Sequence, residues 1–99
     1  MKISIVCFIM LTVALAGCST EPTVSGAVLA EEKGCVACHG TNGQATAAIY
    51  PNLNLQWERY LRVQLLRYKS GERSNAIMNG FASTLTDEQI RALAEHYGR

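Results

Sequence analysis

The feature that most constrains this chain is the run Cys35-Val36-Ala37-Cys38-His39, in a sequence of only 99 residues. A chain of this length buries a modest hydrophobic core, and it commonly needs a disulfide, a metal or a cofactor to hold one structure. Two thiols on one turn of backbone, followed at once by an imidazole, are suited to anchor such a group. The length also excludes a multidomain enzyme.

In an exported protein, a Cys-x-x-Cys-His run is the attachment signature of c-type haem. Each thiol can add to a vinyl group of the porphyrin and form a thioether, and the adjacent histidine is then placed under the iron as an axial ligand. We therefore predict one covalently bound haem c, attached through Cys35 and Cys38, with His39 as an iron ligand.

Three other chemistries are compatible with a pair of cysteines at this spacing. A thioredoxin-like redox pair lies in a βαβ unit, whereas residues 27–33 favour a helix. A zinc site needs four nitrogen or sulfur ligands, and the mature chain offers only the two cysteines, His39 and the remote His96. A structural disulfide between the cysteines stays open, although it leaves His39 without a role.

The N-terminus has the pattern of a secretory signal, with Lys2, an apolar run over residues 3–16 and small residues at its end. A transmembrane helix is the alternative, but the apolar run is shorter than the roughly 20 residues that span the hydrocarbon layer. Removal of 17 of the 99 residues leaves 82 for the fold and takes Cys7 with it.

Residues 15–18, Leu-Ala-Gly-Cys, resemble the lipobox of bacterial lipoproteins. The resemblance implies cleavage before Cys18, acylation of that cysteine, and anchoring at the periplasmic face of a membrane, because several acyl chains hold a protein where one does not. Ser19 resembles the residue that accompanies transfer to the outer membrane. We expect residues 18–25 to form a flexible tether and residues 26–99 to form the folded domain.

The charge balance excludes a nucleic-acid-binding protein held by a basic surface. The formal net charge is +1, and loss of Lys2 with the signal brings it to zero. Affinity for a phosphate backbone instead depends on a strong excess of lysine and arginine.

Met78 is the predicted second axial ligand of the iron. It is the only methionine after the signal, and helix-breaking residues on both sides of it (71, 74, 75, 79 and 80) predict that it lies in an irregular segment. A low-spin electron carrier needs a second strong ligand, and His96 is the other candidate. His96 lies off the apolar face of the last helix, so we expect it to face solvent.

Three helices can be predicted, and no segment alternates as a strand does. The first covers about residues 26–33 and the second about 56–69, ended by Gly71. The third starts at Thr86, with Gln89 completing a capping box. The apolar face of the second helix is Trp57, Leu61, Leu65 and Tyr68, and that of the third is Ile90, Leu93, Ala94 and Tyr97. The expected fold is all-α, with three or more helices around one haem.

Residues 27–97 resemble a small bacterial class I cytochrome c. The haem motif, Tyr50-Pro51-Asn52-Leu53, residues 60–65, residues 69–73, Met78 and residues 85–90 occur in the order found in that family. The resemblance implies that the first and last helices cross, with a small or aromatic residue at the contact. Tyr97 suits the last helix, while residues 27–30 carry no aromatic ring.

The resemblance also implies a set of haem neighbours. The carbonyl of Pro51 would accept the Nδ1–H of His39 and leave Nε2 for the iron, although a turn proline without haem contact is the alternative. Residues 52 and 53 (Asn52 and Leu53) would line the haem edge. Tyr50 and Trp57 could donate to a haem propionate, with helix packing equally able to explain Trp57. Arg73 would lie near the propionates, unless it is a solvated charge.

Four basic residues, Arg59, Arg62, Arg67 and Lys69, could form a docking patch for an acidic partner, although a solvated helix face is the commoner arrangement. Glu58, Glu72 and the haem propionates limit any positive field there.

The predicted function is single-electron transfer by a lipid-anchored periplasmic monohaem cytochrome between redox proteins, with no catalytic residue, no small-molecule substrate and no nucleic acid. The alternatives are a cytochrome subunit fixed in a dehydrogenase or terminal oxidase, a haem catalyst or ligand sensor with an open sixth site, and a haem-free thiol oxidoreductase.

Overall fold

The computed structural model describes Gly17 and residues 24–99. Almost all of the predicted signal peptide, the Cys18 lipidation site and Ser19 therefore lie outside the described residues. The described chain forms five helices and no strand: α1 (Gly26–Glu32), α2 (Val36–His39), α3 (Glu58–Ser70), α4 (Ala76–Ser83) and α5 (Asp87–Tyr97). The predicted all-α fold is confirmed. None of these helices has the length and apolar character needed to span a bilayer.

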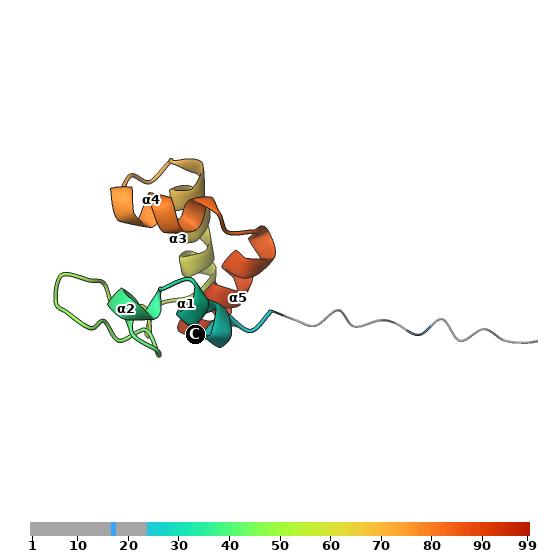
Figure 1. Ribbon diagram of the computed structural model, residues 1–99, viewed down its shortest axis with the longest axis horizontal. Helices are drawn as coiled ribbons and strands as arrows, with labels where there is room; N and C mark the ends of the chain where they lie inside the picture. Colours follow the sequence, from blue (N-terminus) through green and yellow to red (C-terminus); the bar gives the residue numbers. More distant parts are fainter. Residues whose placement is uncertain (1–16, 18–23) are drawn as a thin grey trace, which may run out of the picture.

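Helix α3 connects the two halves of the domain. It packs against α4 on one side and against α5 on the other, and α5 in turn packs against α1. Figure 1 shows α4 near one end of α3 and the pair of α1 and α5 near its other end, while α2 and the long segment after it lie to one side. Cys35 and His39 of the haem motif face residues of α3 across a cavity.

Local sequence signals set the helix ends. The Thr86 hydroxyl accepts the backbone N–H of Gln89 and the Gln89 side chain accepts the backbone N–H of Thr86, so the predicted capping box is present. Ser25 caps α1 in the same way through the N–H of Val28. Gly71 ends α3 with φ +82°, a conformation that glycine adopts without steric cost.

The α1–α5 crossing depends on a glycine. A Cβ atom at Gly26 would overlap the carbonyl oxygen of Ala92 and lie 2.7 Å from the Cβ of His96. The two helices therefore approach at backbone distance, and Leu29 and Ala30 are buried beside the contact. The small residue at this contact is Gly26, whereas the sequence analysis considered residues 27–30 for the first helix.

The core lies where α1, α3 and α5 meet. It consists of Leu29, Ala30, Leu61, Ala82, Leu85, Ile90, Leu93, Ala94 and Tyr97. The predicted inward face of α5 is confirmed, and Leu61, Leu65 and Tyr68 of α3 pack as predicted.

The prediction that Trp57 shares the inward face of α3 is wrong. Trp57 is the residue before the helix, its backbone is extended (φ −65°, ψ 134°), and 63% of it is exposed. Because it does not follow the helical repeat, its ring points outward, where the Arg99 guanidinium lies 4.6 Å from the ring centroid.

Candidate haem site

A mostly apolar cavity of about 230 Å³ lies between α3, α4, α5 and the segment that follows α2. Most of the residues predicted for the haem site line it. These are Cys35, His39, Pro51, Asn52, Leu53, Arg73 and Met78. The fold thus gathers into one space residues that are up to 43 positions apart in the sequence, from Cys35 to Met78.

The imidazole of His39 is held by the carbonyl of Pro51. His39 Nδ1 lies 3.0 Å from that oxygen. A carbonyl oxygen can only accept, so Nδ1 carries the proton and Nε2 presents its lone pair. The hydrogen bond predicted from Pro51 is therefore present, and it orients a ring nitrogen able to ligate a metal.

The two cysteines lie on one turn of backbone around α2. The N–H of Cys38 donates to the Cys35 carbonyl at 3.3 Å, and no disulfide joins the two thiols. Cys35 lines the cavity and burial raises the pKa of its thiol. Cys38 is half-buried outside the cavity lining, and hydrogen bonding to its side chain raises the pKa of Tyr50.

The segment after α2 folds back through two glycines. Gly40 (φ +75°) and Gly43 (φ +81°) take conformations that side chains disfavour, and a Cβ at Gly40 would overlap the carbonyl oxygen of Gln44. The Gly43 carbonyl accepts the N–H of Leu53 at 2.7 Å. The Asn52 side chain accepts the N–H of Ala45 at 2.7 Å. These bonds bring Pro51, Asn52 and Leu53 to the cavity wall.

Met78 lies in the first turn of α4, so the prediction of an irregular segment around it is wrong. The Asn75 side chain accepts the N–H of Met78 at 3.0 Å and caps the helix. Asn79 continues the helix because its amide bonds elsewhere: Nδ2 donates to the carbonyls of Tyr68 (2.7 Å) and Arg73 (2.9 Å). Its Oδ1 accepts the N–H of Asn75 at 2.8 Å. Tertiary hydrogen bonds thus override the local tendency of asparagine to break a helix.

Tyr97 joins α5 to the haem motif. Its hydroxyl donates to the Gly40 carbonyl at 3.0 Å, and its ring lines the cavity. Burial, aided by the charge of a Cys35 thiolate, raises the pKa of Tyr97 to about 12. Tyr97 therefore stays neutral and hydrogen-bonded across the physiological range.

A family model described as cytochrome c matches residues 23–96 of this chain. The chain belongs to the cytochrome c family. Members of this family carry haem c bound covalently through cysteine thioethers, so this cytochrome binds haem c.

Relatives of this cytochrome come from several bacteria. It is 46% identical over 66 residues to cytochrome c-554(548) of Halomonas halodenitrificans, a match covering 64% of this chain and 80% of that one. It is 43% identical over 70 residues to the thiosulfate dehydrogenase electron acceptor of Thiomonas intermedia, covering 70% of this chain but only 32% of that protein. Among solved structures, cytochrome c4 of Acidithiobacillus ferrooxidans matches with a TM-score of 0.63 and 27% identity. That match covers 73% of this chain and 45% of cytochrome c4, so the cytochrome spans less than half of the longer relatives.

The cavity of this cytochrome suits a haem. Its wall is mostly apolar, as a porphyrin requires, and it contains a thiol, an imidazole with a free Nε2 and a thioether. In the described residues no buried side-chain nitrogen or oxygen lacks a hydrogen-bond partner.

Besides Cys38, three residues considered in the sequence analysis as haem neighbours or ligands lie outside the cavity lining. Trp57 and Tyr50 are not among the lining residues, and their hydrogen bond to a propionate stays a prediction. His96 was expected to face solvent, and that prediction is wrong: it is half-buried, with Nε2 2.8 Å from the carbonyl oxygen of Thr41. The imidazole thus ties α5 to the segment after α2.

Several lining residues were not predicted as haem neighbours, and most of them lie in α3 or just before it. The cavity is also lined by Gln56, Tyr60, Gln64, Tyr68 and Leu93. Tyr60, Gln64 and Tyr68 are spaced by four and run beside the apolar stripe of Leu61 and Leu65, so they share one flank of the helix. This spacing is the signal that could have found them.

Proposed function

We propose that this cytochrome is a single-electron carrier of the bacterial periplasm, anchored to a membrane by a lipid on Cys18. In this proposal Cys35 and Cys38 form the thioethers, and His39 and Met78 are the axial ligands. The observation that carries the proposal is the convergence of Cys35, His39 and Met78 on one cavity, with the Nδ1–H of His39 already bonded to a backbone carbonyl.

The chain's own residues would hold the iron environment constant during electron transfer. The haem, when bound, supplies a ferrous–ferric couple. Pro51 fixes the tautomer and orientation of His39 and makes the ring a stronger donor. The Asn75 and Asn79 hydrogen bonds hold the helix that carries Met78. The apolar wall excludes water, and a neutral thioether ligand in such an environment favours the ferrous state.

The partners we propose are membrane-associated redox proteins, such as a dehydrogenase that supplies electrons or a terminal oxidase that accepts them. One relative is named as the electron acceptor of a thiosulfate dehydrogenase, which supports a partner of this class. A lipid tether would keep the cytochrome at high effective concentration near such partners. If the cytochrome purified with a dehydrogenase in fixed stoichiometry, it would be a permanent subunit of that enzyme and not a diffusing carrier.

Substitution of Met78 tests the axial assignment. Met78→Ala should leave the haem attached and remove the weak far-red absorbance band typical of iron bound to methionine sulfur. Ile77→Ala, on the exposed side of α4, is the matched control and should keep the band. An unchanged band in Met78→Ala would exclude Met78 as a ligand.

Two further variants test the covalent link and the anchor. Replacing Cys35 and Cys38 together with alanine should remove the haem mass from the denatured protein. Cys18→Ala should release a red, water-soluble protein from the membrane fraction. A Cys18→Ala protein that still partitions with membranes would contradict the lipid anchor.

A further inference from the structure

We propose that a shallow groove on the outer side of α3 docks a redox partner that presents carboxylates around an apolar or aromatic centre. The groove is formed by Trp57, Arg59, Tyr60, Val63, Gln64 and Arg67, and we call this set the α3 groove. The inference rests on the proposed electron-carrier function and adds to it the surface and the chemistry of the partner.

The α3 groove exposes aromatic and apolar side chains. Trp57 is 63% exposed, Tyr60 46% and Val63 37%. Tyr60 and Val63 are spaced by three on α3 and share one face of the helix, and Trp57, just before the helix, borders the same groove with Arg99 over its ring. Exposed aromatic residues in a hollow are the usual anchors of protein interfaces.

The α3 groove also adjoins the haem cavity. Tyr60 and Gln64 line both, so a single layer of side chains separates a partner in the groove from the cavity. A partner seated there could exchange an electron with the haem without entering the protein. A small, weak interface suits such brief redox encounters.

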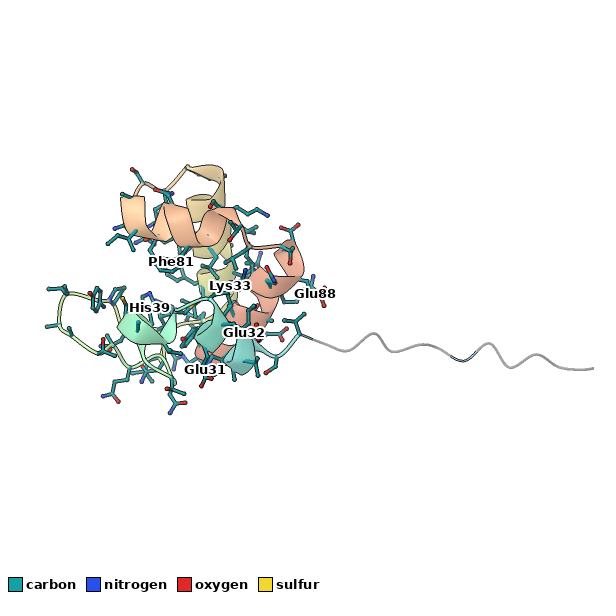
Figure 2. All side chains as sticks on the ribbon, in the orientation of Figure 1. Glu31, Glu32, Lys33, His39, Phe81 and Glu88 are labelled. Carbon is teal, nitrogen blue, oxygen red and sulfur yellow. The ribbon has the colours of Figure 1, made fainter. Side chains whose placement is uncertain are left out.

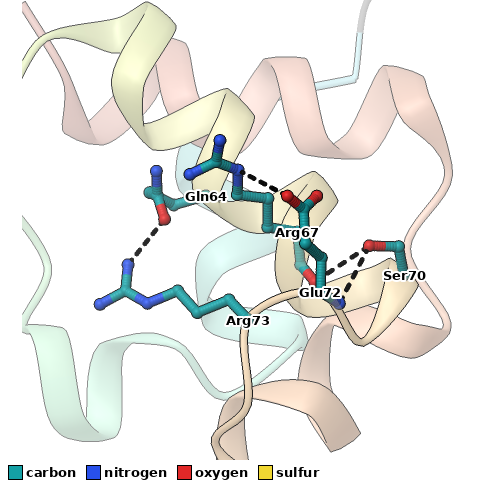
Figure 3. Close-up of polar contacts among 5 residues, drawn as sticks. All are labelled: Gln64, Arg67, Ser70, Glu72 and Arg73. Atoms are coloured by element: carbon teal, nitrogen blue, oxygen red, sulfur yellow. Dashed lines mark hydrogen bonds and ion pairs between the residues drawn. The ribbon is translucent and has the colours of Figure 1, made fainter.

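Positive charge surrounds the exposed aromatic and apolar side chains of the α3 groove. Arg59 forms no ion pair with any residue of the described chain. Arg67 lies 3.7 Å from Glu72, but both side chains are about half exposed or more, so this pair is weak and can be exchanged for a partner's carboxylate. Figure 3 shows the Arg67–Glu72 pair beside Gln64, with Arg73 donating to the neutral Gln64 amide at 2.9 Å.

The charge of the domain is distributed unevenly along the chain. Residues 56–75 contain five basic and two acidic side chains, a net charge of +3, whereas the remaining residues of 24–99 contain three basic and five acidic ones, a net charge of −2. Figure 2 shows Glu31 and Glu32 on α1 and Glu88 on α5, away from α4. This uneven distribution favours the approach of an acidic protein to α3 over α1, while Lys69 of α3 lies 3.9 Å from Asp87 of α5.

The test uses the haem-loaded protein and a flavodoxin, an acidic flavoprotein that donates single electrons, as the probe. The reduced, ¹⁵N-labelled cytochrome is titrated with oxidised flavodoxin, and amide shifts are mapped. Rates of electron transfer from reduced flavodoxin are measured for the wild type, Arg59→Glu and the matched control Arg91→Glu, which changes the same charge on α5. Arg59→Gln and Arg91→Gln form a milder second pair, and urea midpoints verify that each variant is folded.

We expect the shifts to concentrate in residues 57–67. At low ionic strength Arg59→Glu should lower the second-order rate constant about three- to tenfold and Arg91→Glu less than about twofold. The difference should vanish near 1 M salt, where charges are screened within about 3 Å. If the variants keep the wild-type redox potential and haem spectrum, the change in rate arises from docking of the partner and not from the haem.

Several results would overturn the proposal. Shifts centred on Ile77 and Phe81 of α4 would move the docking surface there, and equal losses in the Arg59 and Arg91 variants would leave only a net-charge effect. Arg59-dependent binding to vesicles of anionic phosphatidylglycerol, without flavodoxin binding, would assign the surface to a membrane. Concentration-dependent dimerisation lost in Arg59→Glu would assign it to a second copy. If the wild type accepts no electron even from small reductants, the carrier function itself fails.

Discussion

Replacing Asn79 with alanine should destabilise the domain and loosen the segment that carries Met78. The Asn79 side chain makes three hydrogen bonds: it donates to the carbonyls of Tyr68 and Arg73 and accepts the N–H of Asn75. These bonds join the end of α3, the connecting segment and the start of α4. No other side chain of the described residues makes three hydrogen bonds.

The magnitude follows from these three bonds. Each contributes about 1 kcal/mol net, and the partly buried Tyr68 carbonyl would be left without this donor, so the expected loss is about 3 kcal/mol. That loss corresponds to roughly a hundredfold fall in the ratio of folded to unfolded protein. It is a large share of the roughly 5–15 kcal/mol by which a domain is stable.

The assay is urea unfolding followed by far-UV circular dichroism, with the far-red band recorded on the same samples. The band should weaken at lower urea in Asn79→Ala than in the wild type, because the α4 segment detaches first. Ser83→Ala is the control. The Ser83 hydroxyl donates to the Gly80 carbonyl at the exposed end of the same helix, so its loss should lower the free energy of unfolding by less than about 0.5 kcal/mol. If Asn79→Ala and Ser83→Ala unfold alike, with the band equally persistent, the reasoning is refuted.

Three further predictions concern packing and titration. Gly26→Ala should lower the free energy of unfolding, measured by chemical denaturation, by about 1–3 kcal/mol, because its Cβ would overlap the Ala92 carbonyl. An unchanged free energy of unfolding would mean that α1 and α5 separate freely. Gly80→Ala should instead stabilise by about 0.5–1 kcal/mol, since nothing lies within 4 Å of a Cβ at this helical position, and a loss of stability would show a hidden contact. Tyr97→Phe should lose about 1 kcal/mol at pH 7 with its hydrogen bond to Gly40. The Tyr97 pKa is raised to about 12, so the hydroxyl stabilises the wild type fully below pH 10 and loses that contribution as the pH rises toward 12. The difference in unfolding free energy between the wild type and Tyr97→Phe, measured at pH 7, 10 and 12, should therefore become smaller as the pH rises. A constant difference would contradict the raised pKa.

Several residues of the proposed haem site could be predicted from the sequence because the patterns that indicate them are local. The spacing of Cys35, Cys38 and His39 is set by one turn of backbone, and the Thr86–Gln89 capping box is a contact between residues three apart. Met78 was found by elimination, as the one methionine after the predicted signal. In each case a few neighbouring residues, or a simple count, carry the whole signal.

Errors arose where long-range contacts outweigh local tendencies. Asn79 breaks helices in isolation but here bonds to carbonyls of Tyr68 and Arg73, so α4 continues through it. Trp57 fits the apolar repeat of α3, yet it precedes the helix and turns outward. His96 is polar and off the apolar face, yet it finds the Thr41 carbonyl 55 residues away.

The all-α class and the haem motif follow from the amino-acid order alone, because helical periodicity and thiol spacing are properties of neighbouring residues. The hydrogen bond between His39 and Pro51 was predicted from the resemblance to a family, and the ligand role of Met78 stays a prediction made by elimination. Only the folded chain decides that Tyr60, Gln64 and Tyr68 face the cavity and that Gly26 is the crossing point. Only the fold, too, gives the basic side of α3 a groove next to that cavity. Such features depend on how far each helix is rotated about its axis and on what packs against it, and several rotations are compatible with the same apolar stripe.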